Sequence, residues 1–332
     1  MIFYWKIIFH KMIISSRTRW DVRGAFRESV RTTGIAMFIE TAQRRLRAMM
    51  SAATGPARSA RYLAGASFVG LGLAASLSAA QADQLDRVKQ RGKLIVGIRN
   101  DYVPFGYLDP KGQNTGFEVD LARAVAKDVL GSETAIEFVP VVASNRIEFL
   151  NAGRIDVIFA TLGVNADRGK VIDFTQHYYS MAGIVLLAPK EATYKSWDDI
   201  RGKKICGSQG NLYNRTLSEK MGAELVLFTG TAEIFSAFQG GRCDAIAYDG
   251  PNLNMKVTED GWKDKYKIAL QTFEYVPIAG GVRKNEPGFL KAVDAAIVKA
   301  EASGLMVEGE KKYNLGESEY VQKRAADAKK AQ

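Results

Sequence analysis

The stretch GRIDVIFATLGVNADRGKVIDFTQHYY, residues 153–179, sets a pattern of strand, polar turn and helix. Its short apolar run, Val157–Ala160, lies between turn-forming residues and has the length of a buried strand. Thr161 and Gly163 follow this strand, and Arg168 lies in the first turn of a helix that Asn165 is expected to cap. A hydroxyl, a bare glycine backbone and a guanidinium fork are suited to hold a carboxylate. Alternatively, Arg168 is a surface arginine in a salt bridge, and the spacing alone leaves both interpretations open.

Strands and helices alternate on both sides of this stretch. The hydrophobic spacing predicts strands at Leu94–Ile98 and Ile136–Val142, with a helix from Phe117 to Val129 between them. A second alternation follows after Trp197, and its strand at residues 245–248 places Asp249 at the C-terminal end. Alternation of this kind implies βαβ units and mostly parallel sheets. In such sheets, ligands bind beyond the carboxyl ends of the strands.

The net charge of +10 over 332 residues belongs mostly to the beginning of the chain. Residues 1–82 hold 12 of the 46 Lys and Arg residues but only 3 of the 36 acidic residues. The remaining chain is close to neutral, so a nucleic-acid partner has no electrostatic support there.

The first 82 residues read as a leader. Arg58 and Arg61 precede an apolar run, Leu63–Leu77, and the small-residue sequence Ala80–Ala82 follows. This order predicts a secretory signal peptide cleaved after Ala82; the alternative is an uncleaved membrane anchor. We expect residues 1–48 to be translated upstream sequence, because a start at Met49 or Met50 gives a signal peptide of ordinary length.

The two cysteines, Cys206 and Cys243, both lie in the exported part. Export to an oxidising compartment favours a disulfide between them. The alternative is a pair of buried thiols.

The motif GFEVDLARAVAKDV, residues 116–129, resembles the signature of the bacterial extracellular solute-binding proteins of family 3, the amino-acid receptors of ABC importers. The resemblance extends over residues 85–313 through segments such as NRIEFLNAGRIDVIFAT and GRCDAIAYD. It implies a periplasmic, monomeric receptor with an amino-acid ligand and a membrane permease as partners. No catalytic residue, cofactor or metal is implied.

The resemblance also implies the fold, which is α/β with two lobes of mostly parallel sheet flanked by helices. Two crossing strands, near residues 180–185 and 275–282, would join the lobes as hinges. We expect residues 83–182 and 281–332 to form the first lobe, and residues 183–280 to form the second.

The resemblance assigns site residues one by one. Arg168 matches the arginine that binds the ligand α-carboxylate, and Thr161 the hydroxyl residue beside it. Gly163 stands where many members have Ser or Thr, so only its backbone can serve. Asp249 matches the carboxylate that binds the α-ammonium group, and Tyr102 the aromatic residue over the ligand. Further expected ligand contacts are Asn211 and Tyr213, from the second-lobe loop, and Arg99 and Arg146.

Arg99 and Arg146 match positions that hold arginines in receptors for acidic amino acids. Three arginines around one pocket, with Asp249 binding the ammonium group, would favour a ligand with a polar or acidic side chain. The alternative is that Arg99 or Arg146 pairs with a neighbouring acid such as Asp101 or Glu148, which would leave a neutral pocket. The residues alone leave this choice open.

Two other functions have to be distinguished from that of a receptor. A dehydratase on the same fold, similar to the periplasmic cyclohexadienyl dehydratases, would need a positioned acid. His177, the one histidine of the exported chain, and Glu274 are stray candidates, and no acid/base pair has a convincing spacing. A sensor ectodomain would need a transmembrane segment after Tyr313, and none is recognisable in the sequence.

Overall fold

The structure is a computed structural model that describes residues 83–181, 183–273 and 276–331. The expected signal peptide and its cleavage site therefore lie outside the described residues, as does Glu274. Residues 81–332 cluster as one compact unit. Two five-stranded sheets and a small three-stranded sheet, β2 (Asp101–Tyr102), β3 (Gly106–Leu108) and β4 (Asn114–Thr115), organise its described part.

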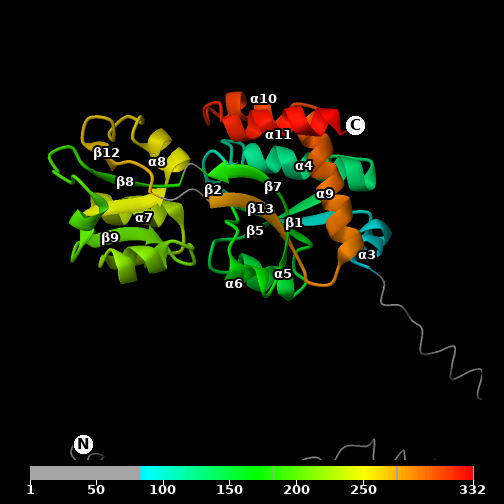
Figure 1. Cartoon of the computed structure of the whole chain (residues 1–332), viewed down its shortest axis with the longest axis horizontal. Helices are drawn as coiled ribbons and strands as arrows, with labels where there is room; N and C mark the ends of the chain where they lie inside the picture. Colours follow the sequence, from blue (N-terminus) through cyan, green and yellow to red (C-terminus); the bar gives the residue numbers. More distant parts are fainter. Residues whose placement is uncertain (1–82, 182, 274–275, 332) are drawn as a thin grey trace, which may run out of the picture. The chain divides into compact units, whose positions relative to one another are not determined.

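The first five-stranded sheet contains the strand of the opening stretch, β6. In this sheet β1 runs parallel to both of its neighbours, whereas β13 is antiparallel to β6 and β7. Its strands in spatial order are β5 (Ile136–Pro140), β1 (Leu94–Ile98), β6 (Val157–Phe159), β13 (Val276–Val282) and β7 (Asp173–Met181). Its helices are α3 (Gln84–Arg91), α4 (Phe117–Leu130), α5 (Arg146–Asn151), α6 (Ala166–Gly169), α9 (Pro287–Ala302), α10 (Leu305–Lys312) and α11 (Glu319–Lys330). We call this sheet with its helices the first lobe (Figure 1).

The second five-stranded sheet has parallel pairs at its β10 side and antiparallel pairs at its β12 side. Its strands in spatial order are β10 (Glu224–Phe228), β9 (Lys204–Ser208), β11 (Ala245–Asp249), β8 (Ile184–Pro189) and β12 (Tyr266–Leu270). Its helical segments are the 3-10 turn Trp197–Ile200, the π-helical turn Thr216–Lys220, α7 (Thr231–Gln239) and α8 (Gly250–Lys256). We call this sheet with its helices the second lobe.

The chain passes between the sheets twice. It leaves the first sheet at the end of β7, Met181, and enters the second at Ile184; it returns between β12 and β13. The expected boundary between residues 280 and 281 falls inside β13, whose pairing with β7 already begins at Val276. Because the whole apolar strand pairs in the first sheet, we now place the return to the first lobe before Val276.

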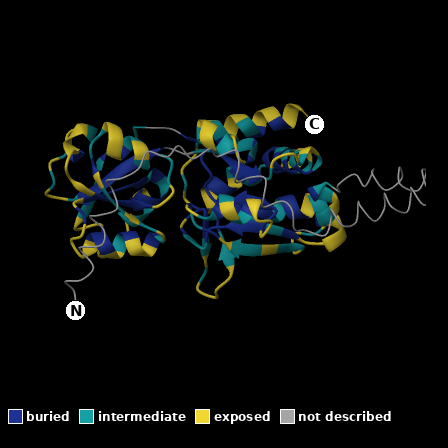
Figure 2. Cartoon of the chain, turned by 90° about the horizontal axis from the view of Figure 1, so that it is seen from below, coloured by how far each residue is buried: buried dark blue, intermediate teal, exposed yellow. Residues whose placement is uncertain are grey.

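The cores explain why these elements form. Figure 2 shows buried residues on the strands and on the helix faces that cover them. In α4 the expected face is buried at Phe117, Leu121 and Val125, whereas Val129 is only half-buried. In α9 the apolar positions at helical spacing are also buried, namely Phe289, Val293, Ala296, Ile297 and Ala300. This helix packs against α4 and α11.

The predicted disulfide is confirmed. Cys206 in β9 is bonded to Cys243, which precedes β11, and their Cα atoms are 5.6 Å apart. The bridge lies within the second lobe, where β9 and β11 are neighbouring strands. Among the described residues, no helix is long and apolar enough to span a membrane.

Candidate functional site

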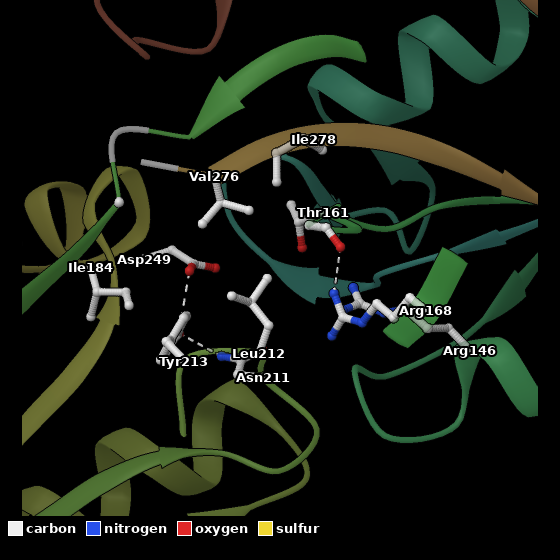
Figure 3. Close-up of a pocket in the computed structure, with 12 residues that line it drawn as sticks. Arg146, Thr161, Arg168, Ile184, Asn211, Leu212, Tyr213, Asp249, Val276 and Ile278 are labelled. Atoms are coloured by element: carbon white, nitrogen blue, oxygen red, sulfur yellow. Dashed lines mark hydrogen bonds between the residues drawn. The ribbon is translucent and has the colours of Figure 1, made fainter. Parts of the chain in front are cut away.

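A small cavity lies where strand ends of the two sheets meet (Figure 3). Thr161 and Gly163 follow β6, Asn211 and Tyr213 follow β9, and Asp249 ends β11. This is the edge at which α/β sheets bind ligands. The space open to water-sized molecules is about 20 Å³, close to the room needed by one water. The lining residues are Arg146, Thr161, Gly163, Arg168, Gly183, Ile184, Asn211, Leu212, Tyr213, Asp249, Val276 and Ile278.

Arg168 projects from α6, where the Asn165 side chain accepts a hydrogen bond from the Arg168 N–H at 2.8 Å, as a cap should. Its Nη1 donates to the carbonyl of Gly163 at 2.7 Å, and its Nη2 donates to the carbonyl of Gly210, in the second lobe, at 3.0 Å. No salt bridge joins Arg168 to a carboxylate of the described chain. Burial lowers the pKa of Arg168. The alternative of a surface salt bridge is therefore not what the structure shows.

Gly210 brings the second lobe close to the first. Its φ of +85° is in the left-handed region, and an added Cβ would lie 2.7 Å from the Cα of Ser144. Only glycine meets both requirements without displacing backbone. The residue thereby places its carbonyl within reach of Arg168.

Arg146 begins α5 and is 2% exposed. Its Nη1 donates to the carbonyl of Ala160, while its Nε has no hydrogen-bond partner in the described part of the chain. Burial, with the nearby charges of Arg168 and Arg99, lowers the pKa of Arg146 to about 9. It forms no salt bridge with Glu148 or any other described carboxylate.

Asp249 is the acidic side chain of the cavity. It accepts a hydrogen bond from the Tyr102 hydroxyl at Oδ2 and one from the Tyr213 hydroxyl at Oδ1, at 3.2 Å. Asn211 donates from Nδ2 to the same Tyr213 oxygen. Burial raises the pKa of Asp249, whereas the two tyrosine hydrogen bonds act in the opposite direction. Asn211 and Tyr213 therefore orient the carboxylate in addition to lining the cavity.

Tyr102 and Arg99 lie outside the cavity lining. The fully buried Tyr102 donates a hydrogen bond from its hydroxyl to Asp249, so it supports the carboxylate. Arg99 is paired with Asp101, with Nη2 to Oδ1 at 2.8 Å, and also donates to the Thr231 hydroxyl at 3.1 Å. Of the two alternatives for Arg99, the structure therefore shows the pairing with Asp101, the first residue of β2.

Sequence reasoning missed the apolar wall, formed by Leu212 with Ile184, Val276 and Ile278. A Cβ added at Gly163 would lie 2.3 Å from Cδ2 of Leu212 and 2.8 Å from Cγ1 of Val276. The glycine therefore makes room for these side chains. The signal was present in the sequence, because a glycine after a strand often marks close approach of another group.

Of the two dehydratase candidates, only His177 lies among the described residues. His177 lies in β7, does not line the cavity, and its backbone carbonyl accepts a hydrogen bond from Tyr320. No group of three or more His, Cys, Asp or Glu side chains in the described ranges could hold a metal ion.

Comparison with known proteins identifies the family. Residues 94–317 match the bacterial extracellular solute-binding proteins, family 3. The glutamine-binding protein GlnH of a Bacillus subtilis (strain 168) ABC transporter is 31% identical over 234 residues, 70% of this chain and 84% of that protein. The glutamate/aspartate import solute-binding protein of Salmonella typhimurium (strain LT2) is 26% identical over 249 residues, 70% and 82% of the two chains. The L-cysteine solute receptor of Neisseria gonorrhoeae superposes with a TM-score of 0.65 at 28% identity, covering 70% of this chain and 93% of the receptor.

The chain belongs to the bacterial extracellular solute-binding proteins, family 3. This confirms the predicted two-lobed α/β fold and the family resemblance. The expectation of mostly parallel sheets was wrong, because each described five-stranded sheet has two parallel and two antiparallel strand pairs. The family and the relatives named above are binding proteins, so the chain is a solute-binding protein and not an enzyme.

Proposed function

We propose that this protein is a periplasmic amino-acid receptor that delivers its ligand to the permease of an ABC importer. The observation that carries the proposal is the charge arrangement of the cavity. The first lobe supplies Arg168 and Arg146, neither of which is paired with a described carboxylate, and the second supplies Asp249. A free amino acid carries the complementary pair, a carboxylate and an ammonium group.

Each end of the ligand has a candidate partner. The Arg168 guanidinium would bind the α-carboxylate, because a fork of N–H donors matches two carboxylate oxygens. Asp249 would bind the α-ammonium group, with its orientation fixed by the hydroxyls of Tyr102 and Tyr213. Because Arg168 and Asp249 belong to different lobes, a zwitterion satisfies both only when the lobes approach each other.

The ligand must displace part of the cavity wall. The cavity holds about 20 Å³ of space for water-sized molecules, which is far less than an amino acid needs. Leu212 lies on the loop after β9 and contacts the first lobe at Gly163. Withdrawal of this loop with the second lobe would open the site, and closure over the ligand would follow.

The ligand's side chain is proposed to be polar or acidic. Arg146 is a buried cation with an unused Nε and no paired carboxylate in the described chain. A charged acceptor satisfies such a group better than a neutral amide. Arg99 gives no support to an acidic ligand, because Asp101 already neutralises it. Glutamate is therefore the first candidate and glutamine the second.

Secretion through a cleaved signal peptide and a monomeric state complete the proposal. The family's extracellular location supports export. N-terminal sequencing of exported protein should begin at Asp83, and a mature chain that keeps residues 63–77 would contradict a soluble receptor.

A ligand screen tests the function. Thermal-shift measurements on the purified exported protein should show a raised melting temperature with one class of amino acid, because a ligand that binds only the folded state stabilises it. The panel should include glutamate, aspartate, glutamine, cystine and arginine, followed by calorimetry. No shift with any amino acid would refute the receptor proposal. Tighter binding of glutamine or arginine than of glutamate would refute only the acidic ligand.

A further inference from the structure

One peptide unit at the end of β6 is held from both sides by buried charged side chains. The carbonyl of Ala160 accepts a hydrogen bond from Nη1 of Arg146. The N–H of Thr161, in the same peptide unit, donates to Oε1 of Glu118 at 2.7 Å. We call this unit, between Ala160 and Thr161, the clamped peptide. Glu118 is fully buried and Arg146 is 2% exposed, so water screens neither charge well.

The clamped peptide precedes an unfavourable backbone conformation. Thr161 has a φ of +48°, in the left-handed region that a β-branched residue rarely adopts. Such a conformation persists only where the surrounding structure imposes it. Thr161 lines the cavity. The hydrogen bond from its N–H to Glu118 fixes the orientation of the peptide plane on the N-terminal side of its Cα, and therefore restrains its φ angle.

Glu118 is well placed to impose this conformation. It is the second residue of α4, between the buried Phe117 and Val119, and so is part of a rigid helix. Its Oε1 also accepts the hydroxyl of Tyr178, while its Oε2 has no hydrogen-bond partner in the described chain. Glu118 does not itself line the cavity.

We propose that Glu118 is a positioning residue of the binding pocket, which holds the clamped peptide so that Thr161 and Arg146 meet the ligand in a fixed geometry. The ligand's identity rests on the proposed function. The consequence is that affinity depends on a side-chain acceptor oxygen at position 118 that never touches the ligand.

Two substitutions at Glu118 test this role by calorimetry with the tightest-binding amino acid of the screen. Glu118→Ala leaves the buried Thr161 N–H without its acceptor, so we expect affinity to fall about tenfold to a hundredfold. Glu118→Gln keeps an acceptor oxygen and should stay within about threefold of the wild type. Glu310→Ala is the matched control, because Glu310 is equally buried but bonds Ser318 and does not line the cavity. Wild-type affinity in folded Glu118→Ala would overturn the proposal, as would equal losses in the Ala and Gln variants.

A double-mutant cycle tests whether Glu118 acts through Thr161. Glycine adopts a positive φ without steric cost, so Thr161→Gly removes the need for the clamp. In that background, Glu118→Ala should weaken binding by less than about a third of its effect in the wild type. An undiminished loss would show that Glu118 acts by another route.

The clamp can also be detected without any ligand. Burial raises the pKa of Glu118 to about 7, against the opposing effects of Tyr178 on β7, the Thr161 N–H, Arg146 on α5 and Arg99 at the end of β1. The amide resonance of Thr161 should therefore shift with a midpoint near pH 7 and be protected from solvent exchange. Glu118→Gln should abolish this shift but leave the titration of His177, whose pKa burial lowers.

Ligand affinity and the Thr161 amide resonance test the proposed function and the clamp separately. If the wild type binds no amino acid, the proposed function fails, and the Thr161 amide still decides whether the clamp exists. An amide that exchanges freely and ignores pH would refute the clamp even in a protein that binds its amino acid normally.

Discussion

Three arginines near the cavity differ in the partners that the fold gives them. Arg99 is neutralised by Asp101, Arg146 is tied to the Ala160 carbonyl, and Arg168 bonds only carbonyl groups. A carbonyl dipole compensates a guanidinium charge less than a carboxylate does. Arg168 and Arg146 therefore keep more capacity to attract an anion than Arg99 does, and the position of Arg168 between the two lobes makes it the better candidate for the α-carboxylate.

Arg168→Ala should leave the fold intact and remove most of the affinity. A carboxylate that is buried without its guanidinium partner typically loses about 2–5 kcal/mol, or some 30-fold to several thousandfold in Kd. Calorimetry with the best ligand measures the loss. Arg215→Ala is a suitable control, because Arg215 is exposed and is paired with Glu219, four residues further along the chain. Near-normal affinity in folded Arg168→Ala would remove this residue from the site.

At the scale of elements, β2 and the residue after it, Val103, join the first lobe to two helices of the second. Asp101 accepts the N–H of Thr231, the first residue of α7, at 2.8 Å. Asn252 of α8 donates to the carbonyl of Val103 at 2.7 Å. An acidic side chain at a helix N-terminus is favourable because it meets unpaired N–H groups and the positive end of the helix dipole. These contacts favour approach of the lobes without touching the ligand.

Asp101→Ala should therefore weaken ligand binding from a distance. The variant loses the charge-assisted contact with the Thr231 N–H and also leaves Arg99 without its carboxylate partner. Loss of the contact between the lobes is worth about 1 kcal/mol, so we expect about a fivefold rise in Kd. Small-angle scattering should show a larger radius of gyration for the variant at subsaturating ligand. Asp260→Ala serves as the control, because Asp260 is exposed and, among the described residues, bonds only the nearby Lys263. Unchanged scattering and affinity would show that Asp101 does not influence closure.

At the scale of the whole molecule, the second lobe has a covalent constraint that the first lacks in the described chain. The Cys206–Cys243 bridge spans a sequence separation of 37 residues. A cross-link of this loop length reduces the entropy of the unfolded chain and thereby stabilises the fold. Neither cysteine lines the cavity, so stability and binding should respond to the bridge separately.

Reduction of the bridge should lower the free energy of unfolding by about 3–4 kcal/mol. Chemical denaturation of the wild type with and without reductant measures this difference. The double variant Cys206→Ala, Cys243→Ala should not respond to reductant and so controls for its other effects. Equal midpoints for oxidised and reduced wild type would contradict a stabilising bridge.

The elements of this fold could be predicted from the sequence because their causes are local. The apolar run at Val157–Phe159 forms a strand as expected, and the Asn165 cap places Arg168 at the turn after it. The burial of Phe117, Leu121 and Val125 follows from their helical spacing. Residues near one another in the chain suffice to decide such features.

The partners of the charged side chains were decided only by the tertiary structure. The sequence left open whether Arg99 faces the ligand or pairs with Asp101. In the structure both residues of this pair also form hydrogen bonds with Thr231 of the second lobe. Glu118 gave no sign in the sequence of its contact with Thr161, 43 residues away. The energy of a charge depends on burial and on every group within a few ångströms, and those groups come from segments distant in the chain. Sequence spacing therefore determined the elements, and only their packing determined which charges remain available to a ligand.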